Sequence, residues 1–196
     1  MKSHTPAKPR LRPEHRRTLL EREALRLFGR RGYAATRLED VAAAAGVTKP
    51  MVYRHFASKK DLYLALLRRH EADLPTFMEG TDLTATGGST AFELVIDGWF
   101  DYVEENKDSW LVLFRDKTGD PDIEEARMSV SRRATEVIAA FIAQSAPDFD
   151  PAVLEPTAEL VRAGLAGLVL WWIDHPDVER ETVHATATRA WAAVLG

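Results

Sequence analysis

Residues 36–60 read TRLEDVAAAAGVTKPMVYRHFASKK and carry the pattern of two short helices joined by a tight turn. Thr36 and Glu39 have the spacing of a capping box, in which a hydroxyl and a carboxylate satisfy the free backbone donors of a helix start. Apolar residues recur at helical spacing over 38–45. Gly46 follows them, and glycine adopts the left-handed conformation without a steric penalty. The first half of the stretch therefore predicts one helix that ends at Gly46.

The second half of the stretch predicts another helix, with one buried face. Thr48 is placed to cap it, and Pro50 fits its first turn, where no intrahelical donor is lost. Successive residues are rotated by about 100°, so Val52 and Phe56 fall together and are expected in the core. Two helices separated by so short a turn form a helix-turn-helix, whose second helix can enter a major groove.

The outer face of this second helix carries side chains suited to DNA. Pro50, Met51 and Arg54 point away from the core, with Tyr53 and His55 on the two flanks. The alternative interpretation is an ordinary amphipathic helix in a small bundle, which needs only a solvated outer face. The distribution of charge along the chain favours the DNA interpretation.

Charge is divided between two parts of the chain. Residues 1–70 hold 17 lysines and arginines against 6 aspartates and glutamates, a formal charge of +11. Residues 71–196 hold 9 against 24, a charge of −15, so the net charge of −4 conceals a basic N-terminal part. A basic module of this kind attracts a polyanion by releasing its condensed counterions. We expect the acidic remainder to lie away from the nucleic acid.

The composition narrows the class of protein. With 196 residues, 45% hydrophobic and 29% charged, the chain is long enough for one or two packed domains. No apolar run approaches the roughly 18 residues that span a bilayer, and the start MKSHTPAKPRLRP lacks the apolar core of a signal peptide. The absence of cysteine excludes disulfides and thiolate metal sites. We expect a cytoplasmic protein with no membrane partner, no metal and no other cofactor.

We expect an all-α chain of about nine helices. Residues 1–12 are assigned to a basic flexible arm, 13–73 to a three-helix helix-turn-helix DNA-binding domain, and 74–196 to a helical bundle that binds ligand and dimerises. The arm suits either minor-groove contact or an inert tail. Ser58-x-x-Asp61 is expected to cap the helix that ends near residue 73. A turn-rich segment follows over 79–89, and the further helices are expected at 90–106, 109–117, 121–145, 152–174 and 178–195.

The helix expected over 152–174 is apolar around most of its circumference. Such a helix must be buried on two sides, and a second subunit can supply one of them. The alternative is a monomer in which this helix is central. Pro156 leaves open a later start of the helix. The residues assigned to the dimer interface, on this helix and the last one, are Leu165, Leu168, Trp172, Trp191 and Val194.

Residues 36–67 resemble the DNA-binding domain of the TetR family of transcriptional regulators. The end of the first helix also fits, with Phe28, Gly32 and Tyr33. The C-terminal part is similar only in its length, its helix count and the segment GLVLWWIDHPD. The positions that match the family pattern are Thr36, Val41, Ala42, Ala45, Gly46, Val47, Thr48, Val52, Tyr53, His55, Phe56, Ser58, Lys59 and Leu62.

The resemblance implies which residues meet double-stranded DNA. The implied set is Thr36 or Arg37 at the helix entry, Thr48, Lys49, Pro50 and Met51 in the groove, and Tyr53, His55 and Lys59 on phosphates. Arg54 is added from its place on the helical wheel. Pro50 stands where the family often has glycine, and with Met51 it offers apolar surface for thymine methyl groups. Lys49 can donate to O6 and N7 of guanine.

The resemblance also implies a mode of regulation. In such regulators the C-terminal bundle forms a homodimer and encloses a small-molecule pocket, and the effector weakens binding to a palindromic operator. A coupling of about 1–3 kcal/mol suffices. The residues assigned to the pocket are Trp99, Trp110, Phe114 and Met128. The choice of repressor over activator rests on family habit alone.

An enzyme is the alternative from another class, and the sequence argues against it. No G-x-S-x-G motif is present, and His70-Glu71 lacks the second histidine of H-E-x-x-H. His175 and His184 are nine residues apart across an expected loop and suit surface positions better than metal ligation. We therefore assign no catalytic residue. A sequence-indifferent architectural DNA-binding protein is the other alternative.

Overall fold

The computed structural model describes residues 13–73 and 89–195, and these form helices joined by short loops, without a strand. The expected all-α class is confirmed. The N-terminal arm and most of the expected turn-rich segment lie outside the described residues. The helices are α1 (Pro13–Ala35), α2 (Leu38–Ala44), α3 (Lys49–Tyr53), α4 (Lys59–Asp73), α5 (Ser89–Glu105), α6 (Lys107–Trp110), the π-helix η1 (Leu111–Arg115), α7 (Pro121–Ser145), α8 (Pro151–Asp174) and α9 (Arg180–Leu195).

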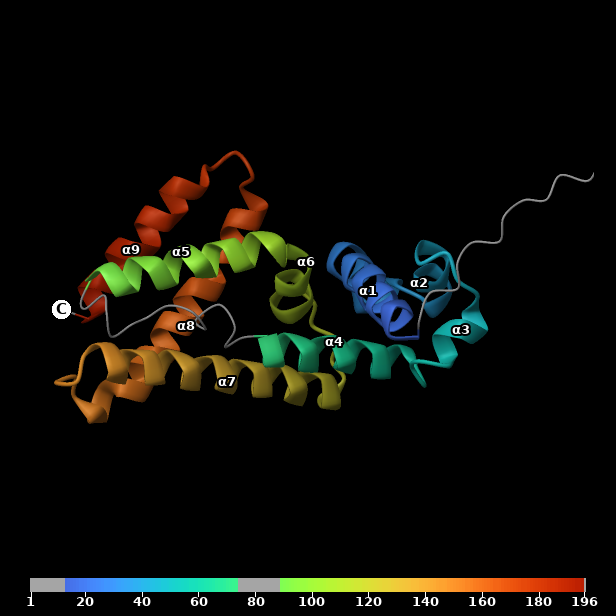
Figure 1. The fold of residues 1–196 in the computed structure, drawn as a ribbon, viewed down its shortest axis with the longest axis horizontal. Helices are drawn as coiled ribbons and strands as arrows, with labels where there is room; N and C mark the ends of the chain where they lie inside the picture. Colours follow the sequence, from blue (N-terminus) through green and yellow to red (C-terminus); the bar gives the residue numbers. More distant parts are fainter. Residues whose placement is uncertain (1–12, 74–88, 196) are drawn as a thin grey trace, which may run out of the picture.

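The molecule is elongated, with α1, α2 and α3 at one end (Figure 1). We call residues 13–73 the head and residues 89–195 the body. Helix α4 belongs to the head but reaches back along α7 (Figure 1), against which it packs. No helix in the described part of the chain is long and apolar enough to cross a membrane.

The head is built around the inner stripe of α1. Leu20, Ala24 and Phe28 are almost completely buried, and the regular part of α1 ends at Gly32, whose φ of 79° is accessible to glycine. The core of the head continues into the body through Val112 of η1 and Ile123 of α7. Because the two parts share one apolar core, they are coupled by packing.

A second apolar core fills the body between α5, α7, α8 and α9. The largest side chains in this core are aromatic. One of them is Trp172, whose indole N–H donates to the carbonyl of Val178 at 2.9 Å. Arg180 at the start of α9 ties it to α5 through the carboxylates of Asp97 and Asp101, at 2.9 and 2.7 Å. Trp172 and Arg180 therefore help to hold the helices of the body together.

The structure corrects three local predictions. The segment expected as one helix over 109–117 is divided into α6 and η1. The capping box at the start of α2 was expected between Thr36 and Glu39. Instead, the backbone N–H of Arg37 donates to the carboxylate of Asp40 at 3.0 Å. Helix α8 begins at Pro151 although Pro156 lies within it, so the later start does not occur. A proline so near the helix start removes one backbone hydrogen bond, which the rest of the helix tolerates.

Candidate nucleic-acid interface and cavity

Helix α3 presents a compact outward face at the end of the head that lies away from the body. Val52 and Phe56 are buried as predicted, while Pro50 and Arg54 are exposed and Tyr53 is 48% exposed. Gly46, with φ of 64°, makes the turn between α2 and α3, and Thr48 occupies the N-cap of α3 without a side-chain cap bond. The Thr48 hydroxyl is therefore not used to hold α3 in place.

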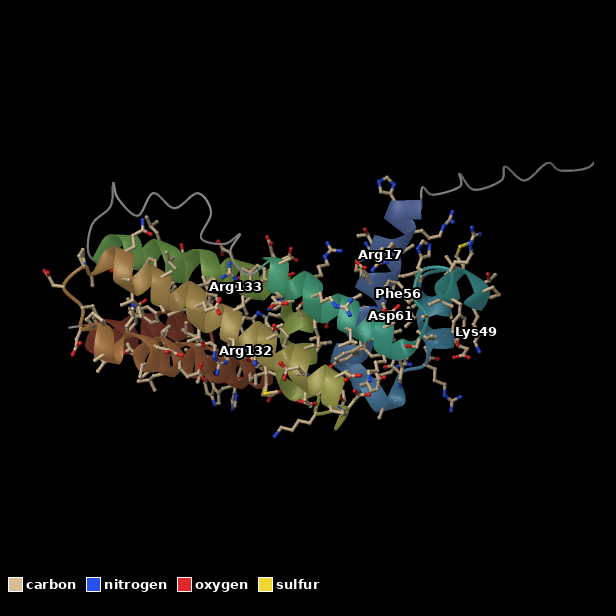
Figure 2. The ribbon with its side chains drawn as sticks, turned by 90° about the horizontal axis from the view of Figure 1, so that it is seen from below. Arg17, Lys49, Phe56, Asp61, Arg132 and Arg133 are labelled. Carbon is tan, nitrogen blue, oxygen red and sulfur yellow. The ribbon has the colours of Figure 1, made fainter. Side chains whose placement is uncertain are left out.

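The first turns of α1 support this face from one side. The Arg17 guanidinium lies over the ring of Phe56, 4.7 Å from its centroid (Figure 2), and its Nε donates to Glu21 at 2.9 Å. Arg16 contacts the sulfur of Met51 at 3.5 Å. The sequence alone did not assign either arginine to the interface, because a surface position near the start of the first helix was the simpler interpretation.

His55 lies among arginine side chains at the edge of α3. Partial burial, and then the positive charges of Arg16, Arg17 and Arg54, lower the pKa of His55 below its usual value. The ring is therefore neutral near pH 7, and a neutral imidazole retains one N–H for donation. Such a cluster of cations beside a helix end is suited to phosphate.

Lys49 lies at the outer end of the head (Figure 2) and forms an ion pair with Glu39 of α2. This pair holds the pKa of Glu39 below and that of Lys49 above the usual values. Both side chains are about half exposed, so solvent screens the pair. Lys49 can therefore exchange Glu39 for a nucleic-acid acceptor at little cost.

Two residues implied by the family pattern face inward. Thr36 is fully buried, and its hydroxyl donates to the carbonyl of Gly32 at 2.9 Å. The Lys59 ammonium donates to the carbonyls of Tyr33 and Thr36, at 2.7 and 3.0 Å. In this arrangement both side chains are thus bonded to backbone carbonyls at the end of α1, and the phosphate role expected for them stays a prediction. Arg37 is exposed and leaves the helix entry open to phosphate.

A cavity of about 70 Å³ lies inside the body. Its wall is almost entirely apolar and includes Val95, Ile96, Trp99, Trp110, Phe114 and Ile138. Three of the four residues assigned to a pocket thus line it. Met128 does not, because its side chain is 51% exposed and lies in a separate groove on α7 and α8.

The few polar groups in the cavity wall carry no available positive charge. Burial lowers the pKa of His70 to about 4, so its ring is neutral, and its Nδ1 lies 3.0 Å from the Tyr102 hydroxyl. Arg162 is held by both carboxylate oxygens of Glu159. Those hydrogen bonds, with one from Thr135, lower the pKa of Glu159 to about 2. The Arg162–Glu159 pair is therefore ionised but internally neutralised.

A short path of bonds joins the cavity to the head. Trp110 and Phe114 stack at 5.0 Å in the cavity wall and belong to α6 and η1. Asp116, immediately after η1, accepts a hydrogen bond from the backbone N–H of Tyr33. Within η1, the carbonyl of Val112 accepts from the Tyr63 hydroxyl at 2.9 Å. The cavity wall is thus connected to α1 through Asp116 and to α4 through Val112.

The residues assigned to a dimer interface lie mostly inside the protomer. Trp172 and Trp191 are 7% and 6% exposed, and Leu165 and Trp191 line the cavity. Leu168 is half-buried against the body core. The Val194 side chain lies outside the described residues. The two tryptophans are therefore corrected to core positions, because α8 turns Trp172 and α9 turns Trp191 into the apolar core of the body.

A different stripe on α8 is open to solvent. Leu160 and Trp171 are 62% and 44% exposed, and a Cβ added at Gly164 or Gly167 would meet no atom within 4 Å. These four residues, which we call the α8 stripe, recur every three or four positions and so share one helix face. The two glycines are already suggestive in the sequence, because they permit close approach of another backbone. Among the described residues, no group of three acidic, histidine or cysteine side chains is placed to hold a metal ion.

Two family models match the chain. Residues 22–66 match the model described as bacterial regulatory proteins of the tetR family. Residues 89–194 match the model of a tetracyclin repressor-like C-terminal domain. The two matches cover the head and the body, so the likeness extends well beyond the helix-turn-helix.

Individual relatives show the same likeness over the full length. The HTH-type transcriptional activator FasR of Mycolicibacterium smegmatis is 27% identical over 192 residues, which are 94% of this chain and 85% of the relative. A tetR-family transcriptional regulator from Streptomyces coelicolor has a crystal structure with a TM-score of 0.73 and 27% identity, covering 92% of this chain and 80% of that one. A putative TetR-family regulator from Rhodococcus sp., at 19% identity, has the same fold, with a TM-score of 0.77 over 93% of this chain and all of the other.

Proposed function

Because the chain belongs to the TetR family of bacterial regulatory proteins, and is thus a DNA-binding transcriptional regulator, we propose that it is a repressor released by a small molecule. It binds a palindromic operator as a homodimer, and the effector enters the cavity of the body. The observation that carries the proposal is the path from that cavity through η1 and Asp116 to the head.

The DNA-reading part of the proposal assigns separate roles on the head. Lys49, Pro50 and Met51 meet base edges, Lys49 through guanine acceptors and the other two through thymine methyl groups. Thr48 faces the groove beside them. Arg37, Tyr53, Arg54 and His55 hold phosphates. Phosphate contacts set the position of the head, and base contacts supply the sequence preference. The exposed position of Pro50 and Arg54 supports these roles.

The α8 stripe supports the homodimer. Two glycines that face solvent between Leu160 and Trp171 permit another helix to approach closely. The same apolar stripe on a two-fold-related copy is self-complementary. Gly164→Arg should therefore yield monomers in analytical ultracentrifugation, whereas Ala140→Arg, on an exposed face of α7, should sediment as the dimer. A wild-type chain that sediments as a monomer at all concentrations would contradict this part.

The effector part of the proposal rests on the size and position of the cavity. At about 70 Å³, it is roughly half of an apolar cavity of about 150 Å³ that holds benzene. An effector must therefore push the wall outward. Trp110 of α6 and Phe114 of η1 form part of the wall, so their displacement moves Asp116 and with it the end of α1. Binding is thereby coupled to the orientation of the head.

Whether the protein represses or activates transcription can be tested directly. The relative named FasR is a transcriptional activator, and an activator is the other outcome for this chain. Transcription in vitro from a promoter that contains the selected operator should fall when the protein is added. It should recover when an effector is present. A rise on addition of the protein would make it an activator.

The test of DNA reading is selection of bound duplexes from a random pool. The expected result is a palindrome with half-sites one helical turn or more apart. Binding to it should persist against excess bulk DNA, whereas an architectural protein would lose it. Lys49→Ala should weaken binding to the selected duplex by about 1–3 kcal/mol and should remove the preference for one base at a single position of the operator. Equal losses on the selected and a scrambled duplex would make Lys49 a phosphate contact.

A further inference from the structure

The wall of the cavity in the body includes a polar group that the protein itself does not satisfy. Trp110 is 5% exposed and lines the cavity, and its indole N–H makes no hydrogen bond to any of the described residues. Buried polar groups are nearly always hydrogen-bonded, because burying a donor without an acceptor is costly. An orphaned indole N–H in a cavity wall therefore indicates an acceptor on the molecule that fills the cavity.

The surroundings of Trp110 fix the ring in one orientation. Its indole stacks on Phe114 with an interplanar angle of 20°, and it meets Trp99 and His70 edge to face, at 85° and 81°. Aromatic contacts on several sides restrict rotation of the side chain. The ring is thus ordered relative to Phe114, Trp99 and His70 before a ligand arrives, and it moves together with these neighbours when the wall is displaced.

A charged ligand finds no counter-charge in this cavity. His70 is neutral, and the Arg162 guanidinium is already neutralised by both oxygens of Glu159. Moving an ion from water into an apolar cavity is strongly unfavourable unless it is paired. An anion could be accommodated only by breaking the Arg162–Glu159 pair, which would leave the Glu159 carboxylate beside it. The wall therefore selects against ions of either sign.

We propose that the effector of this regulator is an uncharged, compact and mainly apolar molecule with one hydrogen-bond acceptor, which accepts from the indole N–H of Trp110. The assignment rests on the proposed function only in treating this cavity as the effector site. The apolar part of the ligand packs against the cavity wall. The hydrogen bond to its single acceptor favours it over ligands of equal shape that lack an acceptor.

Three probes of nearly equal shape separate these requirements. Acetophenone carries a carbonyl acceptor, α-methylstyrene replaces the oxygen by a methylene group, and benzoate carries a charge. Isothermal titration of the full-length protein in the absence of DNA should give acetophenone about threefold to tenfold tighter binding than α-methylstyrene, the value of one net hydrogen bond. Benzoate should bind more weakly than both.

A nuclear magnetic resonance measurement locates the acceptor. With ¹⁵N-labelled tryptophan, the indole N–H signal that is absent from Trp110→Phe should move downfield with acetophenone and much less with α-methylstyrene. In Trp110→Phe the preference for the ketone should vanish. The matched control is Trp172→Phe, since the Trp172 N–H already donates to Val178 within the protein, and this variant should retain the preference.

The outcomes are decisive in both directions. Equal binding of the ketone and the hydrocarbon, tighter binding of benzoate, or no binding of acetophenone up to its solubility limit would overturn the assignment. The comparison of probes on the wild-type chain does not depend on the folding of any variant. Failure of the proposed function would give a different result. Acetophenone would still bind more tightly than α-methylstyrene, but the affinity of the protein for its operator would not change.

Discussion

The carboxylate of Asp116 accepts a hydrogen bond from the backbone N–H of Tyr33, and so it joins the end of η1 to the end of α1. Nearby, Gly29 lies so close to α6 that an added Cβ would stand 3.2 Å from the carbonyl of Asp108. The head and the cavity wall are therefore in direct contact, and no long chain of intermediates is needed to connect them.

Asp116→Ala should uncouple the head from the cavity. The variant should still bind the operator, but a compound that releases the wild-type protein by about 5-fold to 150-fold should release it by less than about threefold. It should also lose about 1–2 kcal/mol of stability, because the Tyr33 N–H is left without its acceptor. Fluorescence anisotropy on labelled operator measures the release. Asp148→Ala, at an exposed turn, is the control, and equal release of both variants would refute the role of Asp116.

Glu39→Gln should tighten DNA binding. The substitution removes the partner that competes with DNA for Lys49 and also one negative charge close to the phosphates. Exposed pairs contribute about 0.2–1 kcal/mol, so we expect operator affinity to rise about twofold to fivefold at low salt, with a smaller gain at high salt. Glu125→Gln, which breaks an exposed pair with Arg132 in the body, should leave affinity unchanged. A weaker complex for Glu39→Gln would show that Glu39 itself contacts the operator.

Lys59 and Arg54 should respond in opposite ways to loss of charge. Lys59→Met should lower the free energy of unfolding by about 2 kcal/mol, since two backbone carbonyls lose a charged donor. Arg54→Met should change stability by less than about 0.5 kcal/mol, yet reduce the slope of log affinity against log salt by about 1. Urea unfolding and salt titrations separate the two effects. A full unit of slope lost in Lys59→Met would show it to be a phosphate contact.

His70 should make the protein less stable in mild acid. Its pKa in the folded chain is about 4, below the usual value of about 6.5, so below pH 6.5 the unfolded chain takes up a proton that the folded chain does not. The contribution of neutral His70 to the free energy of unfolding is therefore fully present above about pH 6.5 and is lost as the pH falls toward 4. Between pH 7.5 and 5, His70→Phe should lose about 2 kcal/mol less stability than the wild type. The exposed His15→Phe should follow the wild type, and parallel curves for all three proteins would contradict the burial of a neutral ring.

The sequence was most predictive where local rules suffice. The turn at Gly46, the burial of Val52 and Phe56, and the capping of α4 by Ser58, whose hydroxyl accepts from the Asp61 N–H at 3.0 Å, all follow from neighbours a few residues apart. Helix periodicity likewise placed most of the body helices within two residues of their observed bounds. The matched family models confirm the family that the residues of α2, α3 and α4 indicated.

Sequence reasoning failed where the tertiary arrangement chooses between equivalent positions. A tryptophan on an all-apolar helix can face the core or a partner, and the packing of α8 against α9 turned Trp172 inward and Trp171 outward. The family pattern marked Lys59, but only the folded chain shows that its ammonium binds the carbonyl of Tyr33. The link from Tyr33 to Asp116 spans 83 positions along the chain, and no local pattern signals it.

The proposal as a whole depends on two heads that bind one duplex in a fixed geometry. The direct measurement is the affinity and stoichiometry, by sedimentation, of the protein on its selected palindrome and on the same palindrome with five extra base pairs between the half-sites. We predict two protomers on the first duplex and an affinity at least about 100-fold lower on the second, because the half-sites then lie on opposite sides of the helix and bivalent binding is lost. Equal affinity for both duplexes, or one protomer on each, would contradict it.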